Sequence, residues 1–97
     1  MEPIKTIDNV CVGYFTLNGE RHKIVTFEEV LYDSLAVNRV TVCIKSPSGY
    51  AFFGVANSDK ANALSEAIND ALYELKVAGV KCDIDSETIS KTLKRID

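Results

Sequence analysis

Residues 10–27 read VCVGYFTLNGERHKIVTF, and this stretch decides the fold. Two runs of β-branched and aromatic residues flank Asn18-Gly19, a dipeptide that tolerates positive φ at both central positions of a two-residue turn. So short a loop fixes the register of the two strands, and Phe15 is therefore expected opposite His22. The segment predicts a β-hairpin. Both of its faces are substantially apolar, so the sequence leaves open which face is buried.

A second hairpin is predicted over residues 39–56. The run RVTVCIKS, residues 39–46, alternates apolar and polar side chains as a half-buried strand does. The turn residues SPSG follow from Ser46 onward and lead into the run YAFFGVA, residues 50–56. A four-residue loop pairs Lys45 with Tyr50. That register gives the core face Val40, Val42, Ile44, Ala51, Phe53 and Val55, and it leaves Tyr50 and Phe52 on the other face.

A long amphipathic helix is predicted at residues 59–78. Capping residues precede it, Gly79 ends it, and its alanine-rich apolar stripe suits close packing on a sheet. Residues 80–84 are a candidate edge strand. An acidic cap and a basic end then predict a C-terminal helix over 86–96.

The segment between the two hairpins admits two interpretations. The residues TFEE, 26–29, fit a helix capping box, and the apolar residues after them fall at helical spacing. We therefore predict a short helix that ends near Asn38. An extended conformation over 27–37 is the alternative, because the apolar residues there also alternate.

The elements together predict an α+β fold. We expect an antiparallel sheet of about four strands, formed by two hairpins and packed on one face by the long helix, with a short helix between the hairpins and a C-terminal helix. A chain of 97 residues suffices for one core, so residues 1–97 are expected to form a single domain, with 1–8 and 97 frayed.

The bulk composition is that of an ordinary globular protein, with 46% hydrophobic and 26% charged residues and a net charge of −3. The chain shows neither a secretion signal nor an apolar run of the roughly 18 residues that a bilayer requires. The three cysteines, Cys11, Cys43 and Cys82, have no metal-binding spacing and are expected to be small buried hydrophobes. These features predict a cytoplasmic protein.

The sequence contains no recognisable catalytic or cofactor-binding motif. The single histidine, His22, is expected to be partly exposed near the hairpin tip, and Cys11 lies too far along the ribbon to form a dyad with it. The acidic run at 83–87 lacks the glycine and the final glutamate of a calcium loop, and there is no phosphate-binding glycine motif. We expect no enzyme activity, no metal and no cofactor.

The face of the sheet opposite the long helix is the candidate binding site. If the two hairpins are coplanar, this face combines aromatic and basic side chains, which are enriched where proteins bind partners. The predicted partner-binding residues are Tyr14, Arg21, Lys23, Arg39, Lys45, Tyr50 and Phe52.

Three functions follow, in order of preference. The first is a small non-enzymatic protein-binding module, such as an adaptor, regulator or inhibitor, phage-encoded ones included; it would also self-associate through the open sheet face or the terminal helix. The second is binding of single-stranded or structured nucleic acid by the same face, since aromatic rings stack bases and lysines neutralise phosphates. The third is a small-ligand-sensing domain with a pocket between helix and sheet.

Overall fold

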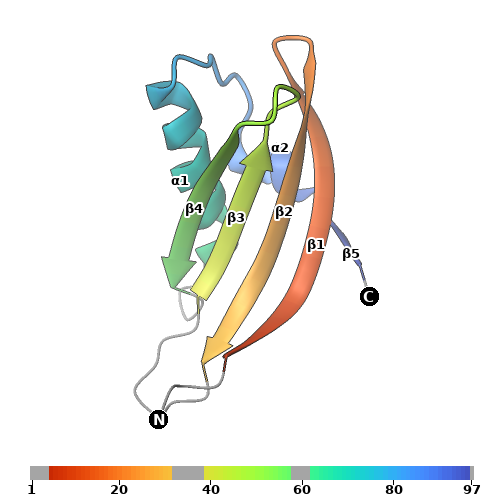
Figure 1. Cartoon of the computed structure of the whole chain (residues 1–97), viewed down its shortest axis with the longest axis vertical. Helices are drawn as coiled ribbons and strands as arrows, with labels where there is room; N and C mark the ends of the chain where they lie inside the picture. The colour runs from red at the N-terminus through yellow and green to blue at the C-terminus, as the bar shows by residue number, and fades with distance from the viewer. Residues whose placement is uncertain (1–4, 32–38, 58–61, 97) are drawn as a thin grey trace.

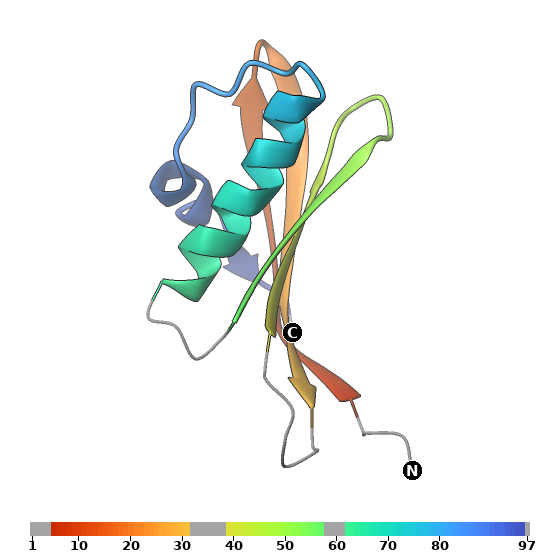
Figure 2. The same cartoon turned by 90° about the vertical axis from the view of Figure 1, so that its left-hand side faces the viewer.

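The computed structural model describes residues 5–31, 39–57 and 62–96, and it has the predicted α+β class (Figure 1). The elements are β1 (Lys5–Leu17), β2 (Glu20–Leu31), β3 (Arg39–Lys45), β4 (Ala51–Asn57), α1 (Ala63–Val77), α2 (Ser86–Ser90) and β5 (Lys94–Arg95). The five strands form one antiparallel sheet in the order β4-β3-β2-β1-β5. Both helices lie on the same face of this sheet, as the edge-on view in Figure 2 shows.

The core lies between the helices and one face of the sheet. Alternate residues of β2 and β3 point toward α1, whose alanine-rich stripe lets the helix lie close to the strands. The most completely buried large side chains are Ile24, Val42, Ile44, Ile68, Leu75 and Ile89. Among the described residues, no helix is long and apolar enough to cross a membrane.

The first hairpin has the predicted register. Asn18 and Gly19 both have positive φ, 51° and 77°, and they form the two-residue turn that the sequence indicates. Phe15 pairs with His22, and the pairing continues in register from Leu17 to Cys11. The register shifts between Asp8 and Cys11, so β1 bends before its pairing with β2 resumes.

The second hairpin corrects the predicted register by one residue. Its loop has five residues, because the Ser46 amide donates to the Tyr50 carbonyl oxygen at 2.9 Å, and Lys45 therefore pairs with Ala51. A shift of one residue exchanges the two faces of a strand. Phe52 and Ala56 consequently lie on the helix side, whereas Phe53 and Val55, predicted in the core, are exposed.

Gly54 gives a physical reason for this register. A Cβ atom at this position would overlap the carbonyl oxygen of Ala67 and the amide nitrogen of Ala71. The backbones of α1 and β4 are therefore in such close approach that only glycine fits between them. If Tyr50 paired with Lys45, Gly54 would instead lie on the face opposite α1. The side chain of Phe53 or Val55 would then have to fit into the narrow space between β4 and α1.

The predicted short helix between the hairpins is wrong for its first residues. Strand β2 continues to Leu31, so Thr26 and Glu29 are strand residues and form no capping box. Thr26 pairs with Val42 and Glu29 with Arg39. The extended alternative is correct as far as Leu31. The remainder of the predicted helix, 32–38, lies outside the described residues.

Helix α1, Ala63–Val77, falls within the predicted range of 59–78, of which residues 59–61 lie outside the described residues. Its end is closed by Gly79, which has φ of 91°, and by a hydrogen bond from the Val80 amide to the Leu75 carbonyl. The candidate strand at 80–84 is not formed.

The predicted C-terminal helix over 86–96 is wrong beyond Ser90. Helix α2 ends there, and the chain turns into β5, which pairs with Cys11 and Val12 of β1. The Ile96 amide donates to the Val10 carbonyl oxygen at 2.9 Å. The free edge of β1 has unpaired backbone N–H and C=O groups, and residues 94–96 form hydrogen bonds with them as a short strand. The backbone groups of these residues are thereby satisfied.

Candidate binding face and groove

The open face is the side of β1 to β4 that lies opposite the helices, and Figure 1 views the sheet from this side. Strand pairing places the apolar residues Tyr14, Val25, Phe53 and Val55 on it. Tyr14, Phe53 and Val55 are 45%, 58% and 47% exposed. Large exposed apolar side chains gathered on one surface are typical of interaction sites.

One end of the open face, near the hairpin turns, is cationic. Lys23 and Lys45 are direct cross-strand partners, and no described carboxylate forms an ion pair with either of them. The Arg21 guanidinium lies 4.2 Å from the centre of the Tyr14 ring, a cation–π contact. Like charges placed opposite each other destabilise a strand pair. The three cations therefore form a patch that favours a negatively charged group.

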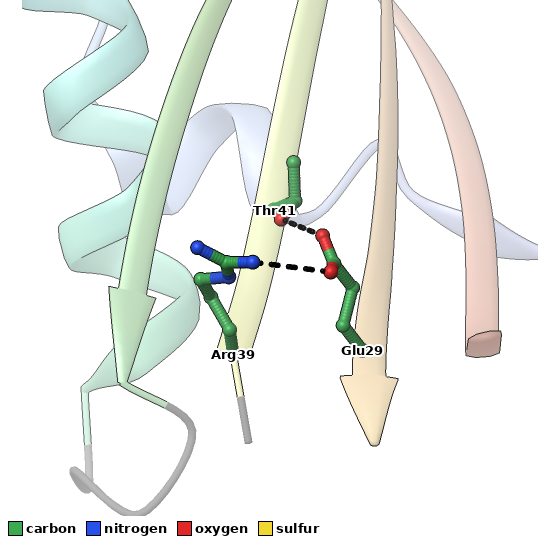
Figure 3. A network of polar contacts seen from close by, with 3 residues as sticks. All are labelled: Glu29, Arg39 and Thr41. Atoms are coloured by element: carbon green, nitrogen blue, oxygen red, sulfur yellow. Dashed lines mark hydrogen bonds and ion pairs between the residues drawn. The ribbon is translucent and has the colours of Figure 1, made fainter. Parts of the chain in front are cut away.

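The other end of the open face has a neutralised polar network (Figure 3). Glu29 is buried and accepts a hydrogen bond from the Thr41 hydroxyl at 3.1 Å. It also forms an ion pair with Arg39 at 3.3 Å. Because Glu29 engages Arg39, this arginine adds less to the net attraction for anions than the unpaired Lys23 and Lys45 do.

Cys43 lies on the open face beside Lys45. Burial raises the pKa of this thiol above its ordinary value, and the Lys45 charge, which lowers the pKa, only partly offsets the effect. The pKa of Cys82 is also raised, again mainly by burial. Both thiols are therefore protonated at neutral pH and are poor nucleophiles. Among the described residues, no group of acidic, cysteine or histidine side chains could hold a metal ion.

The structure brings five of the seven predicted partner-binding residues to the open face. They are Tyr14, Arg21, Lys23, Arg39 and Lys45. Tyr50 instead lies in the turn before β4, and Phe52 faces the helix side. Phe53 takes the place expected of Phe52. Phe53 was not predicted on this face because a loop of four residues was expected where the structure has five. Gly54, which must face a close backbone, is the sequence signal for the longer loop.

A groove lies on the other side of the sheet, between the two hairpin turns and the C-terminal end of α1. Its volume is about 520 Å³. Leu17, Phe52, Leu75 and Val80 supply its apolar lining, and Tyr50 stands at its rim, 71% exposed. Two residues predicted for the open face, Tyr50 and Phe52, thus belong to a separate concave site.

His22 lines this groove and is buried, contrary to the partial exposure expected for it. Its ring stacks on Phe15 at a centroid distance of 5.6 Å, and its Nδ1 lies 3.1 Å from the Glu20 carbonyl oxygen. The carbonyl can only accept, so Nδ1 carries the hydrogen. The first hairpin therefore holds the imidazole in one orientation.

Comparison with known proteins adds no relative. No protein-family model matches this chain, and neither a curated protein nor a solved structure matches it significantly. Arguments about its function therefore rest on the geometry of the open face and the groove.

Proposed function

We propose that this chain is a small protein-binding module that docks its open face on an acidic surface of another protein. The observation that supports the proposal most directly is the pairing of Lys23 with Lys45, without an ion-paired carboxylate, beside the exposed Phe53. Exposed aromatic residues and arginine are the side chains that most often dominate binding energy at protein interfaces.

Charge complementarity favours an acidic partner over a second copy of the chain. Among its described residues, the open face carries four basic side chains, Arg21, Lys23, Arg39 and Lys45, against the single buried carboxylate of Glu29. The whole chain has a net charge of −3, so the remaining surface is acidic. Two open faces brought together would repel each other, whereas an acidic surface would be attracted. Self-association through the open face, one of our initial hypotheses, is therefore not what the charge distribution favours.

The same face is less suited to single-stranded nucleic acid. Tyr14 lies on β1 and Phe53 on β4, so the two residues are about 14 Å apart across the sheet, three strand spacings, and are also offset by two residues along the strands. Lys23, Val25 and Cys43 lie between them, and the one further ring that the described residues of β2 and β3 place on this face is the half-buried Phe27. Successive bases stack on neighbouring aromatic side chains in proteins that bind single strands. The unpaired lysines remain an attraction for phosphates, so the test includes an oligonucleotide.

The test compares partner capture by the native chain with capture by two groups of variants. Lys23→Glu with Lys45→Glu reverses the cationic patch, and Phe53→Asp removes the exposed ring. Lys76→Glu with Lys91→Glu makes the same charge change at exposed residues of α1 and of the C-terminal end of α2, on the helix side of the sheet. Extract from the native host is passed over each immobilised protein at about 50 and 300 mM salt, where screening differs strongly.

The expected result is one or more acidic proteins retained by the native chain and by the matched control pair. Capture should be lost in the Phe53→Asp variant and in the double variant Lys23→Glu with Lys45→Glu. Capture by the native chain should weaken at the higher salt concentration. Equal capture by all variants would rule out the open face. Tight binding of a 20-nucleotide poly-dT at low salt, if the double substitution Lys23→Glu with Lys45→Glu abolishes it, would instead support the nucleic-acid alternative.

A further inference from the structure

The groove beside α1 has walls that hydrogen bonds hold in place. The Asn18 side-chain amide donates to the Lys81 carbonyl at 3.2 Å and ties the first hairpin turn to the chain after α1. The Val80 amide closes the helix end on the Leu75 carbonyl, and the Ser46 hydroxyl accepts from the Tyr50 amide at 3.1 Å. A site whose walls are fixed before binding loses little conformational entropy when a ligand enters. The groove is therefore pre-formed.

The lining selects against anionic ligands. Leu17, Phe52, Leu75 and Val80 make the floor apolar, and Glu20 is the one ionisable carboxylate among the described lining residues. No lysine or arginine belongs to the lining that the structure describes. Pockets of about 300 to 1,000 Å³ with an apolar lining and a few polar groups are the usual form of small-molecule sites. The groove thus suits an uncharged, largely apolar molecule.

His22 supplies the polar group that fixes the orientation of such a molecule. The side chain is only 3% exposed, one ring face is covered by Phe15, and Nδ1 is engaged by the Glu20 carbonyl. In the neutral ring Nε2 is then an acceptor, and no hydrogen bond to it is formed by the residues that the structure describes. A buried acceptor without a partner costs free energy, so native proteins rarely keep one without use.

We infer that this groove binds an uncharged aromatic molecule that carries a hydroxyl or N–H donor, with the donor directed to Nε2 of His22 and the ring lying against Phe52 and Leu75. The site is on the helix side of the sheet, opposite the open face, so it is independent of the proposed docking of a protein partner. The chain would therefore bind a small molecule in the groove in addition to a protein partner on the open face.

The probe for the test is 2-naphthol, and its matched control is 2-methoxynaphthalene, which has the same rings but no donor. Binding is followed by two-dimensional NMR, with the ring nitrogens of His22 observed directly. The expected result is a shift of the His22 Nε2 signal and of the backbone amides of Gly79 and Val80 with 2-naphthol. Its affinity should exceed that of the methoxy compound about five- to tenfold, the effect of one net hydrogen bond.

Variants separate the hydrogen bond from the apolar contact. His22→Phe keeps a ring to stack on Phe15 but removes the acceptor, so both compounds should bind with equal, reduced affinity. Ala78→Trp places a large side chain at an exposed lining position and should block both compounds, which keeps the test valid if His22→Phe does not fold. Tyr73→Ala removes an exposed ring on α1 outside the groove and should leave both affinities unchanged.

Three results would overturn the inference. The first is the absence of binding of either compound to the native chain at millimolar concentration. The second is equal affinity of the native chain for both compounds. The third is a set of shifts confined to the open face. Any of these would mean that the groove has no ligand of this class.

Discussion

The two hairpins differ in how firmly their turns determine which side chains face the core. In the first, both turn residues have positive φ and Asn18-Gly19 admits a two-residue loop. In the second, the five residues 46–50 form a looser turn in which a four-residue loop would also satisfy the local turn chemistry. A hairpin register is thus determined locally only when the turn is short. With a longer turn, packing against another element decides it.

The largest expected effect tests the packing that sets the second register. Gly54→Val should lower the free energy of unfolding by about 3 kcal/mol, because the new side chain would meet the backbone of α1, which cannot move aside. The neighbouring Val55→Ala, on the exposed face, should change it by about 0.5 kcal/mol. Urea denaturation measures both. A Gly54→Val protein as stable as the native chain would show that α1 does not lie close to β4.

Gly13→Ala extends the same test to the first hairpin. A Cβ atom there would meet the Thr92 hydroxyl and, at 3.0 Å, the Thr92 backbone. A side-chain oxygen can rotate away, so we expect a smaller loss of about 1 to 2 kcal/mol by the same measurement. If Gly13→Ala destabilised the protein more than Gly54→Val, the contact of the first hairpin with Thr92 would be tighter than the contact of the second hairpin with α1.

The second prediction addresses the register directly through two adjacent phenylalanines. Phe52→Asp should destabilise the fold by about 2 kcal/mol because it buries a carboxylate against the core, whereas Phe53→Asp should cost about 0.5 kcal/mol. The register derived from the four-residue loop predicts the opposite order. Midpoints of chemical denaturation for the two variants therefore distinguish the registers.

The third prediction concerns the seam at which the two hairpins join. Glu29→Ala should cost about 1 to 2 kcal/mol, because it leaves the buried Thr41 hydroxyl without its acceptor. Arg39→Ala should cost less, about 0.5 to 1 kcal/mol, because the arginine side chain is half exposed. A double-mutant cycle of Glu29→Ala with Thr41→Val measures the coupling. No coupling between them would contradict the hydrogen bond across β2 and β3.

The fourth prediction compares two substitutions in the first turn. Asn18→Gly keeps the positive φ and loses only the hydrogen bond to Lys81, whereas Asn18→Ala also forces alanine into the left-handed region. We expect Asn18→Ala to be the less stable by about 1 kcal/mol in thermal or chemical denaturation. Equal stability of the two variants would show that the turn conformation does not hold the first register.

The smallest effect is a pH dependence in α2, the helix that lies behind the first hairpin. The Thr88 side chain and amide hydrogen-bond to Asp85, the amide at 2.8 Å, and these bonds hold the pKa of that carboxyl below its ordinary value. The cap therefore stabilises α2 above the ordinary carboxyl pKa, and the stabilisation is lost as the pH falls through the lowered pKa. The Thr88 amide shift, followed by NMR during acid titration, should report this loss. In Asp85→Asn that transition should be absent.

Much of the fold could be predicted because its signals are local. The Asn18-Gly19 turn, the alternation over 39–45 and the amphipathic stripe of α1 depend on near neighbours in the chain. The cationic residues of the open face were also located correctly, since the register of the first hairpin and the alternation of β3 place them there. Their role in binding a partner remains a prediction.

The errors concern segments whose local preferences are balanced. Residues 26–31 suit a helix start or a strand, and cross-strand pairing with β3 selects the strand. Residues 91–96 could extend α2, but the free edge of β1 captures them as β5. In both cases, pairing with a strand that is distant in the sequence selects the conformation of the segment. The pattern of neighbouring residues does not show which distant strand will be available.

By itself, the sequence determined the class of the fold, the first hairpin with its register, and the basic residues that share one face. Short-range backbone geometry is sufficient for these features. Only the tertiary structure decided the register of the second hairpin, the exposure of Phe53 in place of Phe52, and the groove that encloses His22. These depend on how closely α1 approaches Gly54 and on which chain segments meet at the helix end, and such distances arise only when the whole core is packed.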